Sequence, residues 1–191
     1  MSVSDPDVML MLRVKDGDDA AFDDILRKYQ KPIINFIYHF VNNRAEAEEL
    51  AQDVFLRVYA ARAKYQPEAK FATWIYKIAT NLCLKKLNQD RISTRLRVSI
   101  DEEKIPELRD TRPNVQMVLE TKEKEEIIAK AINSLPRNEK AAILLRKRQS
   151  LSYKEIANTI GCTEGAVKTY IHRAKIRLRE RLSLYLEGKM K

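Results

Sequence analysis

Cysteine, glycine and proline are scarce in this chain, and their scarcity excludes several kinds of protein. The 191 residues include two cysteines, four glycines and six prolines. Cys83 and Cys162 each stand without another cysteine or a histidine at ligand spacing, so we expect no metal site and interpret both as small, buried apolar side chains. Leucine, alanine, lysine, arginine and glutamate are abundant instead, which favours helices over sheets.

Long apolar runs are also missing. No segment has the eighteen or so consecutive apolar residues that a membrane-spanning helix needs, and the acidic start with Pro6 lacks the basic and apolar parts of a signal peptide. We therefore expect a cytoplasmic protein without direct membrane insertion. Glycine-rich phosphate loops, nucleophile elbows and paired catalytic carboxylates are absent too, so we expect no enzyme and no cofactor.

Positive charge is concentrated at one end of the chain. The net charge is +9, and residues 120–191 carry 17 basic against 9 acidic side chains, so eight of the nine excess charges lie there. A small basic segment is suited to a polyanion, because each neutralised phosphate releases condensed counterions. Solubility alone would also explain such an excess.

The length favours two small helical domains over one bundle. Residues 93–119 lack helical periodicity, balance their charges and contain Pro106 and Pro113, which is typical of a linker. We predict an all-α protein with a first domain at residues 1–92, a flexible linker at 93–119 and a second domain at 120–191.

The first domain has clear helix signals. Asp5 with Pro6 predicts a helix start, and Gly17 predicts its end. Asn43, followed by Glu46, resembles a capping box. Steps of three and four predict a helix with one apolar face, formed by Phe22, Leu26, Tyr29, Ile33, Phe36, Ile37 and Phe40. Pro32 would kink or split that helix. The next helix repeats Leu50, Val54 and Val58, with a polar opposite face.

Aromatic and lysine side chains are interleaved between residues 64 and 86. Such a mixture can stack unpaired bases while lysines hold the backbone of a single strand. The simpler reading is that the aromatics belong to the core of a small bundle, since Trp74, Ile75 and Ile78 fit a buried stripe. The side chains concerned are Lys64, Tyr65, Lys70, Phe71, Trp74, Tyr76, Lys77, Lys85 and Lys86.

The second domain contains the pattern of a helix-turn-helix. Ser152 and Glu155 predict a capping box, Gly161 ends a short helix, and Thr163 can cap the next one. A buried stripe is then expected at Val167, Ile171, Ala174, Leu178 and Leu182. The opposite face offers donors for guanine edges and phosphates: Lys168, Thr169, His172, Arg173, Lys175, Arg177 and Arg179.

These segments together resemble the extracytoplasmic-function sigma factors, which retain the second and fourth conserved sigma regions. Residues 47–59 are similar to the family's polymerase-binding helix, and residues 71–81 to its promoter-melting segment. Leu135-Pro136, residues 152–157 and residues 165–175 are similar to its region-four signature. The order and separation of these motifs extend the resemblance over nearly the whole chain.

The resemblance implies a promoter-specificity factor that binds core RNA polymerase, reads the −35 element as duplex and reads the −10 element as a melted strand. Contacts with the clamp helices of the largest polymerase subunit would come from Glu49, Gln52, Asp53 and Arg57. Those with the −10 element would come from Tyr65, Lys70, Phe71, Trp74, Tyr76, Lys77, Asn81 and Lys85. Those with the −35 element would come from Ser152, Thr163, Lys168, Thr169, Tyr170, His172, Arg173, Lys175 and Arg177.

The resemblance also implies a path for the linker and a regulatory partner. The linker would run through the active-site and RNA-exit channel, where acidic residues 101–103 would mimic nucleic-acid charge. An anti-sigma factor would hold the protein inactive, in some cases at the inner membrane. Ala166 stands where the family commonly has threonine, and this departure leaves the promoter sequence open.

Two other functions fit parts of the sequence. A self-sufficient helix-turn-helix regulator would bind duplex without polymerase, with a first domain that senses a ligand or dimerises. A helical adaptor would place the basic end on a membrane surface, although the apolar stripe of the last helix lacks an exposed aromatic anchor along most of its length.

Overall fold

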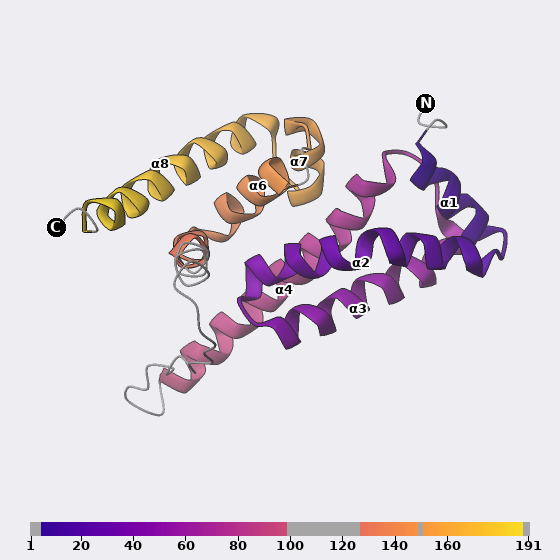
Figure 1. The fold of residues 1–191 in the computed structure, drawn as a ribbon, viewed down its shortest axis with the longest axis horizontal. Coiled ribbons are helices and arrows are strands. Elements are labelled where there is room, and N and C mark those ends of the chain that lie inside the picture. Colours follow the sequence, from indigo (N-terminus) through magenta and orange to yellow (C-terminus); the bar gives the residue numbers. More distant parts are fainter. Residues whose placement is uncertain (1–4, 99–126, 149–150, 189–191) are drawn as a thin grey trace, which may run out of the picture.

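The computed structural model describes residues 5–98, 127–148 and 151–188, which form two helical bundles (Figure 1). The first bundle contains α1 (Pro6–Lys15), α2 (Asp19–Val41), α3 (Arg44–Ala60), the short 3-10 helix η1 (Arg62–Lys64) and α4 (Phe71–Val98). The second contains a helix at residues 127–133, followed by α6 (Arg137–Arg148), α7 (Tyr153–Ile160) and α8 (Glu164–Gly188). No strand occurs within these ranges, and the all-α prediction is confirmed.

The helix-start and helix-stop signals of the first bundle act as predicted, except that Asn43 and Glu46 form only one half of the expected capping box. Asp5 caps α1, and Gly17 follows that helix with a φ of 95°, a conformation open to glycine. Asn43 caps α3 by accepting a hydrogen bond from the backbone N–H of Glu46 at 3.2 Å. The Glu46 carboxylate forms an ion pair with Lys86 of α4 at 2.6 Å, which ties α3 to α4.

The predicted apolar face of α2 forms the centre of the first core. Ile33, Phe36 and Ile37 are no more than 2% exposed, while Phe22 and Leu26 are half-buried. The helix continues without a break across Pro32, which lies on the exposed side. Proline therefore neither splits nor ends this helix.

The fourth helix is longer than the sequence indicates. It continues to Val98 and so includes residues 93–98, which the sequence assigns to the linker. The expected acidic segment at residues 101–103 and the expected domain start near residue 120 lie outside the described residues. The exact domain limits remain a prediction.

The second bundle has the helix-turn-helix geometry that its caps predict. Ser152 and Glu155 form a complete capping box, and Gly161 ends α7 in the left-handed conformation with a φ of 71°. The Oγ1 atom of Thr163 accepts a hydrogen bond from the backbone N–H of Ala166 at 3.2 Å, as a cap of α8 should. The turn between the two helices is therefore only residues 161–163.

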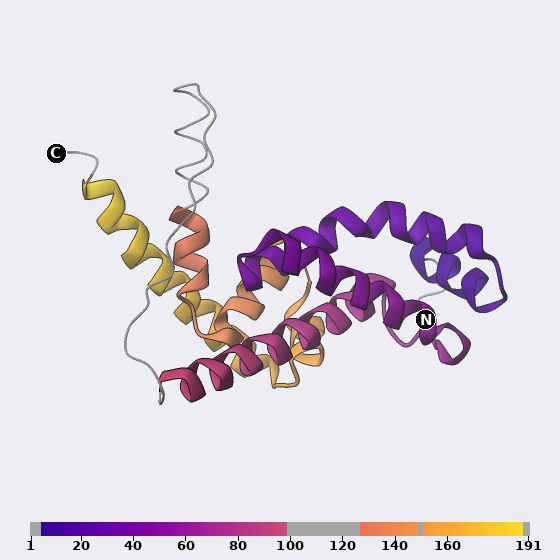
Figure 2. The same cartoon turned by 90° about the horizontal axis from the view of Figure 1, so that it is seen from below.

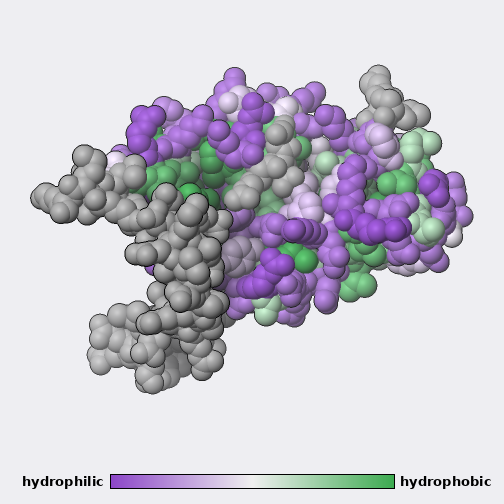
Figure 3. Space-filling model, in the orientation of Figure 1, coloured by the Kyte–Doolittle hydropathy of each residue, from purple (hydrophilic) through white to green (hydrophobic). Residues whose placement is uncertain are grey.

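One stripe of α8 faces the core of this bundle. Val167, Ile171 and Ala174 are at most 3% exposed, and they contact the helix α6, whose Leu145 is fully buried. Leu178 and Leu182, also predicted for the stripe, are half-buried. Figure 3 shows hydrophilic side chains along the outer edge of α8 and hydrophobic ones on its inner side.

The two bundles lie against each other. Helix α7 contacts α4, and α6 contacts both α2 and α4 (Figures 1 and 2). Most of the first bundle's side of this contact therefore comes from α4. The buried apolar residues of both bundles belong to one connected cluster. The second bundle therefore covers part of the first.

Candidate nucleic-acid interface

The outer face of α8 carries the predicted base-reading side chains. They project away from the core stripe, and all but Tyr170 are exposed: Lys168, Thr169, Tyr170, His172, Arg173, Lys175 and Arg177. Tyr170 is half-buried, and its hydroxyl lies 3.5 Å from Nδ2 of Asn138. A helix with donors on one face and a capped, tight turn before it is suited to the major groove.

Some of these side chains already have partners in the free protein. The hydroxyl of Thr169 donates to the carbonyl of Gly165 at 3.1 Å. Nε of Arg177 lies 3.2 Å from Oε2 of the buried Glu139, an ion pair whose angles do not make a hydrogen bond. Arg177 therefore links α8 to α6, whereas Arg173 and Lys175 remain exposed.

Ser152 and Thr163 serve as helix caps. The hydroxyl of Ser152 donates to Oε2 of Glu155 at 2.7 Å and accepts from the backbone N–H of Glu155 at 3.2 Å. Thr163 has the same role at α8. Ser152 thus fixes the start of α7, and Thr163 fixes the start of α8, which carries the predicted base-reading face.

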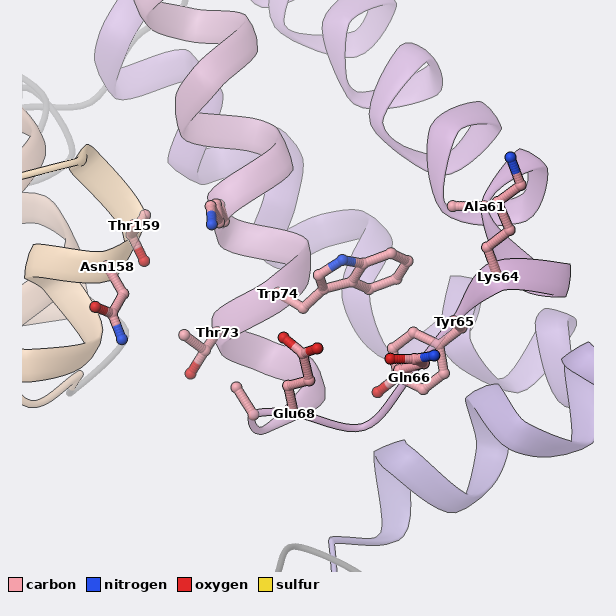
Figure 4. A pocket seen from close by; sticks show the side chains of 11 residues that line it. Ala61, Lys64, Tyr65, Gln66, Glu68, Thr73, Trp74, Asn158 and Thr159 are labelled. Carbon is pink, nitrogen blue, oxygen red and sulfur yellow. The ribbon is translucent and has the colours of Figure 1, made fainter.

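A cavity of about 530 Å³ lies beside the predicted −10 segment (Figure 4). It is open to solvent, and its wall comes from both bundles. The first bundle contributes Ala61, Lys64, Tyr65, Gln66, Glu68, Ala69, Thr73, Trp74 and Lys77. The second contributes Asn158 and Thr159 from α7.

The aromatic residues of this segment are mostly core. Tyr65, Phe71 and Tyr76 are 4%, 0% and 2% exposed, so the interpretation of all four aromatics as one open stacking platform does not match the free protein. Trp74 is half-buried and lines the cavity together with the buried Tyr65. Its ring lies 4.9 Å from that of Tyr65 and 5.8 Å from that of Phe71, between centroids, so the buried rings support it.

The loop that carries Tyr65 is anchored by the N-terminal helix. Nζ of Lys15 donates to the carbonyl of Tyr65 at 3.0 Å, and Oδ2 of Asp5 accepts from the backbone N–H of Phe71 at 3.3 Å. Burial, together with the nearby charge of Asp5, raises the pKa of Tyr65 to about 12. The phenol therefore stays neutral at physiological pH.

The remaining predicted −10 residues lie on the surface of the same segment. Lys70, Lys77, Asn81 and Lys85 are exposed, and among them Lys77 lines the cavity. Asn81 and Lys85 follow Lys77 at intervals of four along α4, so they continue one helical face away from it. The arrangement is a cavity at the start of α4 with polar and basic side chains leading from it.

The predicted polymerase-binding face lies on the outer side of α3. Glu49 and Gln52 are exposed, and Arg57 pairs with Asp53 one turn away at 3.2 Å. Leu56, on the same outer side, is 68% exposed, more than Met9, Ile128 or Ile176, the other exposed large apolar side chains of the described residues. Leu56 is not among the residues predicted to bind the polymerase, although its position outside the stripe of Leu50, Val54 and Val58 indicates an exposed leucine.

Two family models match this chain. Sigma-70 region 2 matches residues 25–92, and Sigma-70 region 4 matches residues 125–178. The RNA polymerase sigma-H factor of Pseudomonas aeruginosa is 32% identical over 180 residues, which cover 92% of this chain and 93% of the relative. The ECF RNA polymerase sigma factor SigW of Bacillus subtilis is 30% identical, over 89% of this chain and 93% of that protein.

This chain belongs to the extracytoplasmic-function sigma factors. It is therefore a specificity factor of transcription initiation rather than a member of a known enzyme family. Membership of this family argues against the two other functions that fitted parts of the sequence, a self-sufficient regulator and a membrane adaptor.

Solved structures agree with the fold of this sigma factor. CnrH in complex with the cytosolic domain of CnrY covers 93% of the chain at a TM-score of 0.68 and 20% identity. RpoE in complex with the anti-sigma factor NepR, from Bartonella quintana, covers 85% at a TM-score of 0.65 and 20% identity. Within the described ranges, no helix is long and apolar enough to span a membrane, and no three potential ligand side chains cluster as a metal site.

Proposed function

We propose that this sigma factor recognises the −35 element as duplex through α8 and the −10 element as a melted strand through the cavity at the start of α4. The observation that carries the proposal is the capped helix-turn-helix, whose reading helix buries Val167 and Ile171 and exposes the basic and polar face opposite them. Arginine and lysine in the major groove bind guanine O6 and N7, and phosphates.

The −10 proposal rests on the shape and chemistry of the cavity. A half-buried Trp74 supported by Tyr65 and Phe71 offers one aromatic surface to an unpaired base, while Lys64 and Lys77 lie at the same cavity. Phe71 and Tyr76 would act by holding this surface in place, since both are buried. Lys70, Asn81 and Lys85 would follow the strand outside the cavity.

The polymerase would bind the outer face of α3. Glu49, Gln52, Asp53 and Arg57 supply polar contacts to the clamp helices, and the exposed Leu56 adds an apolar centre of the kind that carries binding energy at interfaces. Residues 1–92, 93–119 and 120–191 would then act as polymerase-binding and melting domain, linker and −35 domain. The protein would act in the cytoplasm, where the polymerase is.

An anti-sigma factor is part of this proposal. Both solved relatives above are complexes with a partner, and in one of them the partner is an anti-sigma factor. Such a partner would inhibit this protein until a signal releases it.

A promoter library with randomised −35 and −10 elements tests the proposal. Core RNA polymerase reconstituted with the purified chain is expected to select one pair of elements in run-off transcription. Arg173→Ala should relax the choice at the −35 element, because loss of one bidentate base contact costs about 1–3 kcal/mol. Arg27→Ala is the matched control, since Arg27 is exposed on α2 and pairs with the neighbouring Asp24 on that helix.

The outcomes separate the parts of the proposal. Selection at the −10 element alone would contradict the role of α8, and selection at the −35 element alone would contradict the role of the cavity. Tight duplex binding without polymerase, combined with no effect of Asp53→Arg on transcription, would indicate an independent regulator instead.

A further inference from the structure

One wall of the cavity proposed for the −10 strand is a loop. Residues 65–70 connect η1 to α4, all of them except Tyr65 are exposed, and the cavity is lined by Gln66, Glu68 and Ala69 (Figure 4). The backbone N–H of Glu68 donates to the carbonyl of Gln66 at 2.9 Å, a local bond that does not tie the loop to a helix. The shape of this wall therefore depends on how the two ends of the loop are held.

Both ends of the loop are bonded to the N-terminal helix α1. At the first end, Nζ of Lys15 donates to the carbonyl of Tyr65 at 3.0 Å. At the second end, Oδ2 of Asp5 accepts from the backbone N–H of Phe71, the first residue of α4, at 3.3 Å. Lys15 is the last residue of α1, and Asp5 is its N-cap. The two ends of one helix thus hold the two ends of the loop.

Asp5 caps two helices with one carboxylate. Its Oδ1 accepts from the backbone N–H of Asp7 at 3.0 Å, at the start of α1, while its Oδ2 accepts from Phe71 at the start of α4. The first N–H groups of a helix have no partner within the helix and carry partial positive charge, so a carboxylate suits both starts. Asp5 therefore fixes the start of α4 relative to α1.

The helix α1 is firmly placed in the first bundle. Val8 and Met11 are fully buried. The hydroxyl of Tyr29 on α2 donates to the carboxylate of Asp7, and the ring of Tyr29 packs edge-on against that of Phe71 with 5.2 Å between centroids. Because α1 is anchored in the core, its polar ends act as fixed points for the loop.

The position of the loop controls the aromatic surface proposed for an unpaired base. The ring of Tyr65 supports that of Trp74 at 4.9 Å between centroids, so a shift of the Tyr65 backbone would move this support. The hydroxyl of Tyr65 is buried without a hydrogen-bond partner among the described residues. Since an unpaired buried hydroxyl costs free energy, the place at which the loop holds Tyr65 also decides whether a bound group can supply that partner.

We propose that Asp5 and Lys15 are positioning residues for −10 recognition, which hold the loop at residues 65–70 between the ends of α1 and so set the shape of the cavity. Neither is among the residues that line the cavity, so both act through the backbone at the ends of the loop. The inference rests on the proposed role of the cavity. It adds that reading of the −10 element depends on a helix that precedes residues 25–92, the part of the chain that matches Sigma-70 region 2.

Four substitutions separate this role from general effects. Lys15→Met removes the ammonium at an exposed position and keeps most of the apolar stem, whereas Lys15→Arg keeps a donor. Asp5→Asn retains a good N-cap residue, but its single oxygen cannot serve the starts of α1 and α4 together. Arg13→Met is the matched control, because it removes a cation of the same helix that pairs with Asp18 in the turn before α2.

Holoenzyme reconstituted with core RNA polymerase is measured on a promoter fork with a duplex −35 element and a single-stranded −10 element. The −10 specificity ratio is the Kd for a fork with altered −10 bases divided by the Kd for the fork with the selected bases. Lys15→Met and Asp5→Asn should each lower this ratio about fivefold, which corresponds to about 1 kcal/mol. The equivalent ratio for the −35 element should not change. Lys15→Arg and Arg13→Met should keep both ratios.

Trp74, the single tryptophan of the chain, gives a reading that needs no DNA. Lys15→Met should increase the quenching of Trp74 by acrylamide, because the ring of Tyr65 is no longer held in place against it. Circular dichroism should show intact helices in this variant. Arg13→Met should match the wild type in both measurements.

The outcomes distinguish this inference from the proposed function. A −10 preference of the wild type that both Lys15→Met and Asp5→Asn retain would overturn the positioning role alone. An equal fall of the −10 and −35 ratios would overturn it as well, since that result indicates a general folding defect. A wild type without any −10 preference would contradict the proposed role of the cavity, and the inference with it.

Discussion

At the scale of single residues, Asp7 is a polar centre of the first bundle. Asp7 is only 7% exposed. Its carboxylate accepts a hydrogen bond from the hydroxyl of Tyr29 at 2.6 Å and forms an ion pair with Lys28 at 2.5 Å. Burial and this carboxylate raise the pKa of Tyr29 above its ordinary value, so the phenol remains a donor. Asp7 therefore connects α1 to α2 through two charge-assisted hydrogen bonds.

Asp7→Asn should destabilise the protein by about 2 kcal/mol, because hydrogen bonds to a charged group contribute about 1.5–3 kcal/mol. Urea denaturation measures the change. Asp24→Asn removes an exposed ion pair with Arg27 and should cost less than about 1 kcal/mol. Equal effects of the two substitutions would show that the bond to Tyr29 is unimportant.

The two cysteines differ in burial, and we expect their thiols to differ in reactivity for that reason. Cys83 is fully buried, and burial raises the pKa of its thiol to about 12. Cys162 is half-buried in the turn of the helix-turn-helix, with a smaller rise in pKa from burial. Because the thiolate is the reactive form, a thiol reagent at pH 8 should label Cys162 well before Cys83.

Cys162→Ser should remove the fast phase of that labelling and leave the slow one. Mass spectrometry of the modified peptides identifies which thiol reacted. Labelling of both cysteines at one rate in the folded protein would contradict the burial of Cys83.

At the scale of elements, the turn between α7 and α8 provides a matched pair of glycines. Gly161 has a φ of 71°, which strains any residue with a Cβ, although the space around it is open. Gly165 lies in helix α8, and a Cβ there would meet only Oγ1 of Thr163 at an ordinary 3.9 Å. Substitution by alanine should therefore have opposite effects on the free energy of unfolding at Gly161 and Gly165.

Gly161→Ala should destabilise the protein by about 1 kcal/mol or more because of the left-handed backbone. Gly165→Ala should stabilise it by up to about 1 kcal/mol, the difference in helix propensity. Thermal unfolding followed by circular dichroism measures both. A stabilised Gly161→Ala would mean that the turn is not held in the left-handed conformation.

Local signals explain which elements the sequence could predict. Caps at Asp5, Asn43 and Ser152 act within three residues, and the stripe on α8 repeats over a few turns, so both are readable along the chain. Pro32 was ambiguous because the cost of proline depends on how the lost hydrogen bond is compensated, which the tertiary structure decides. The extension of α4 to Val98 was missed for want of a periodic apolar pattern.

At the scale of the whole molecule, the contacts between the two bundles could not be predicted from the sequence. The bond between Lys140 and Phe40 joins residues 100 positions apart, and that between Thr73 and Glu155 joins residues 82 apart. No single motif contains both residues of either pair, and Lys140 looks like any surface lysine in a basic segment. The burial of Phe71 and Tyr76 is likewise a tertiary fact, since aromatic composition fits both a core and a stacking surface.

The contact between the two bundles also predicts a dependence on pH. The closed state is the one in which Lys140 bonds the carbonyl of Phe40, and the open state is one in which the bundles are separated. Burial lowers the pKa of Lys140 to about 8 in the closed state, with the nearby Cys83 opposing the shift, whereas an open, hydrated Lys140 would return to its ordinary value of 10.5. Between these values the closed state binds fewer protons than the open one. Closure is therefore favoured as the pH rises from about 8 toward 10.5, and below about 8 the effect of pH disappears.

Acrylamide quenching of Trp74 should consequently fall in the wild type between pH 7.5 and pH 9.5, the range in which closed molecules release the Lys140 proton while open ones keep it. Cys83 does not confuse the result, because its pKa of about 12 keeps the thiol protonated across this range. Lys140→Glu lacks the titrating amine and should show a flat profile. A fall of equal size in that variant would assign the pH response to a group other than Lys140.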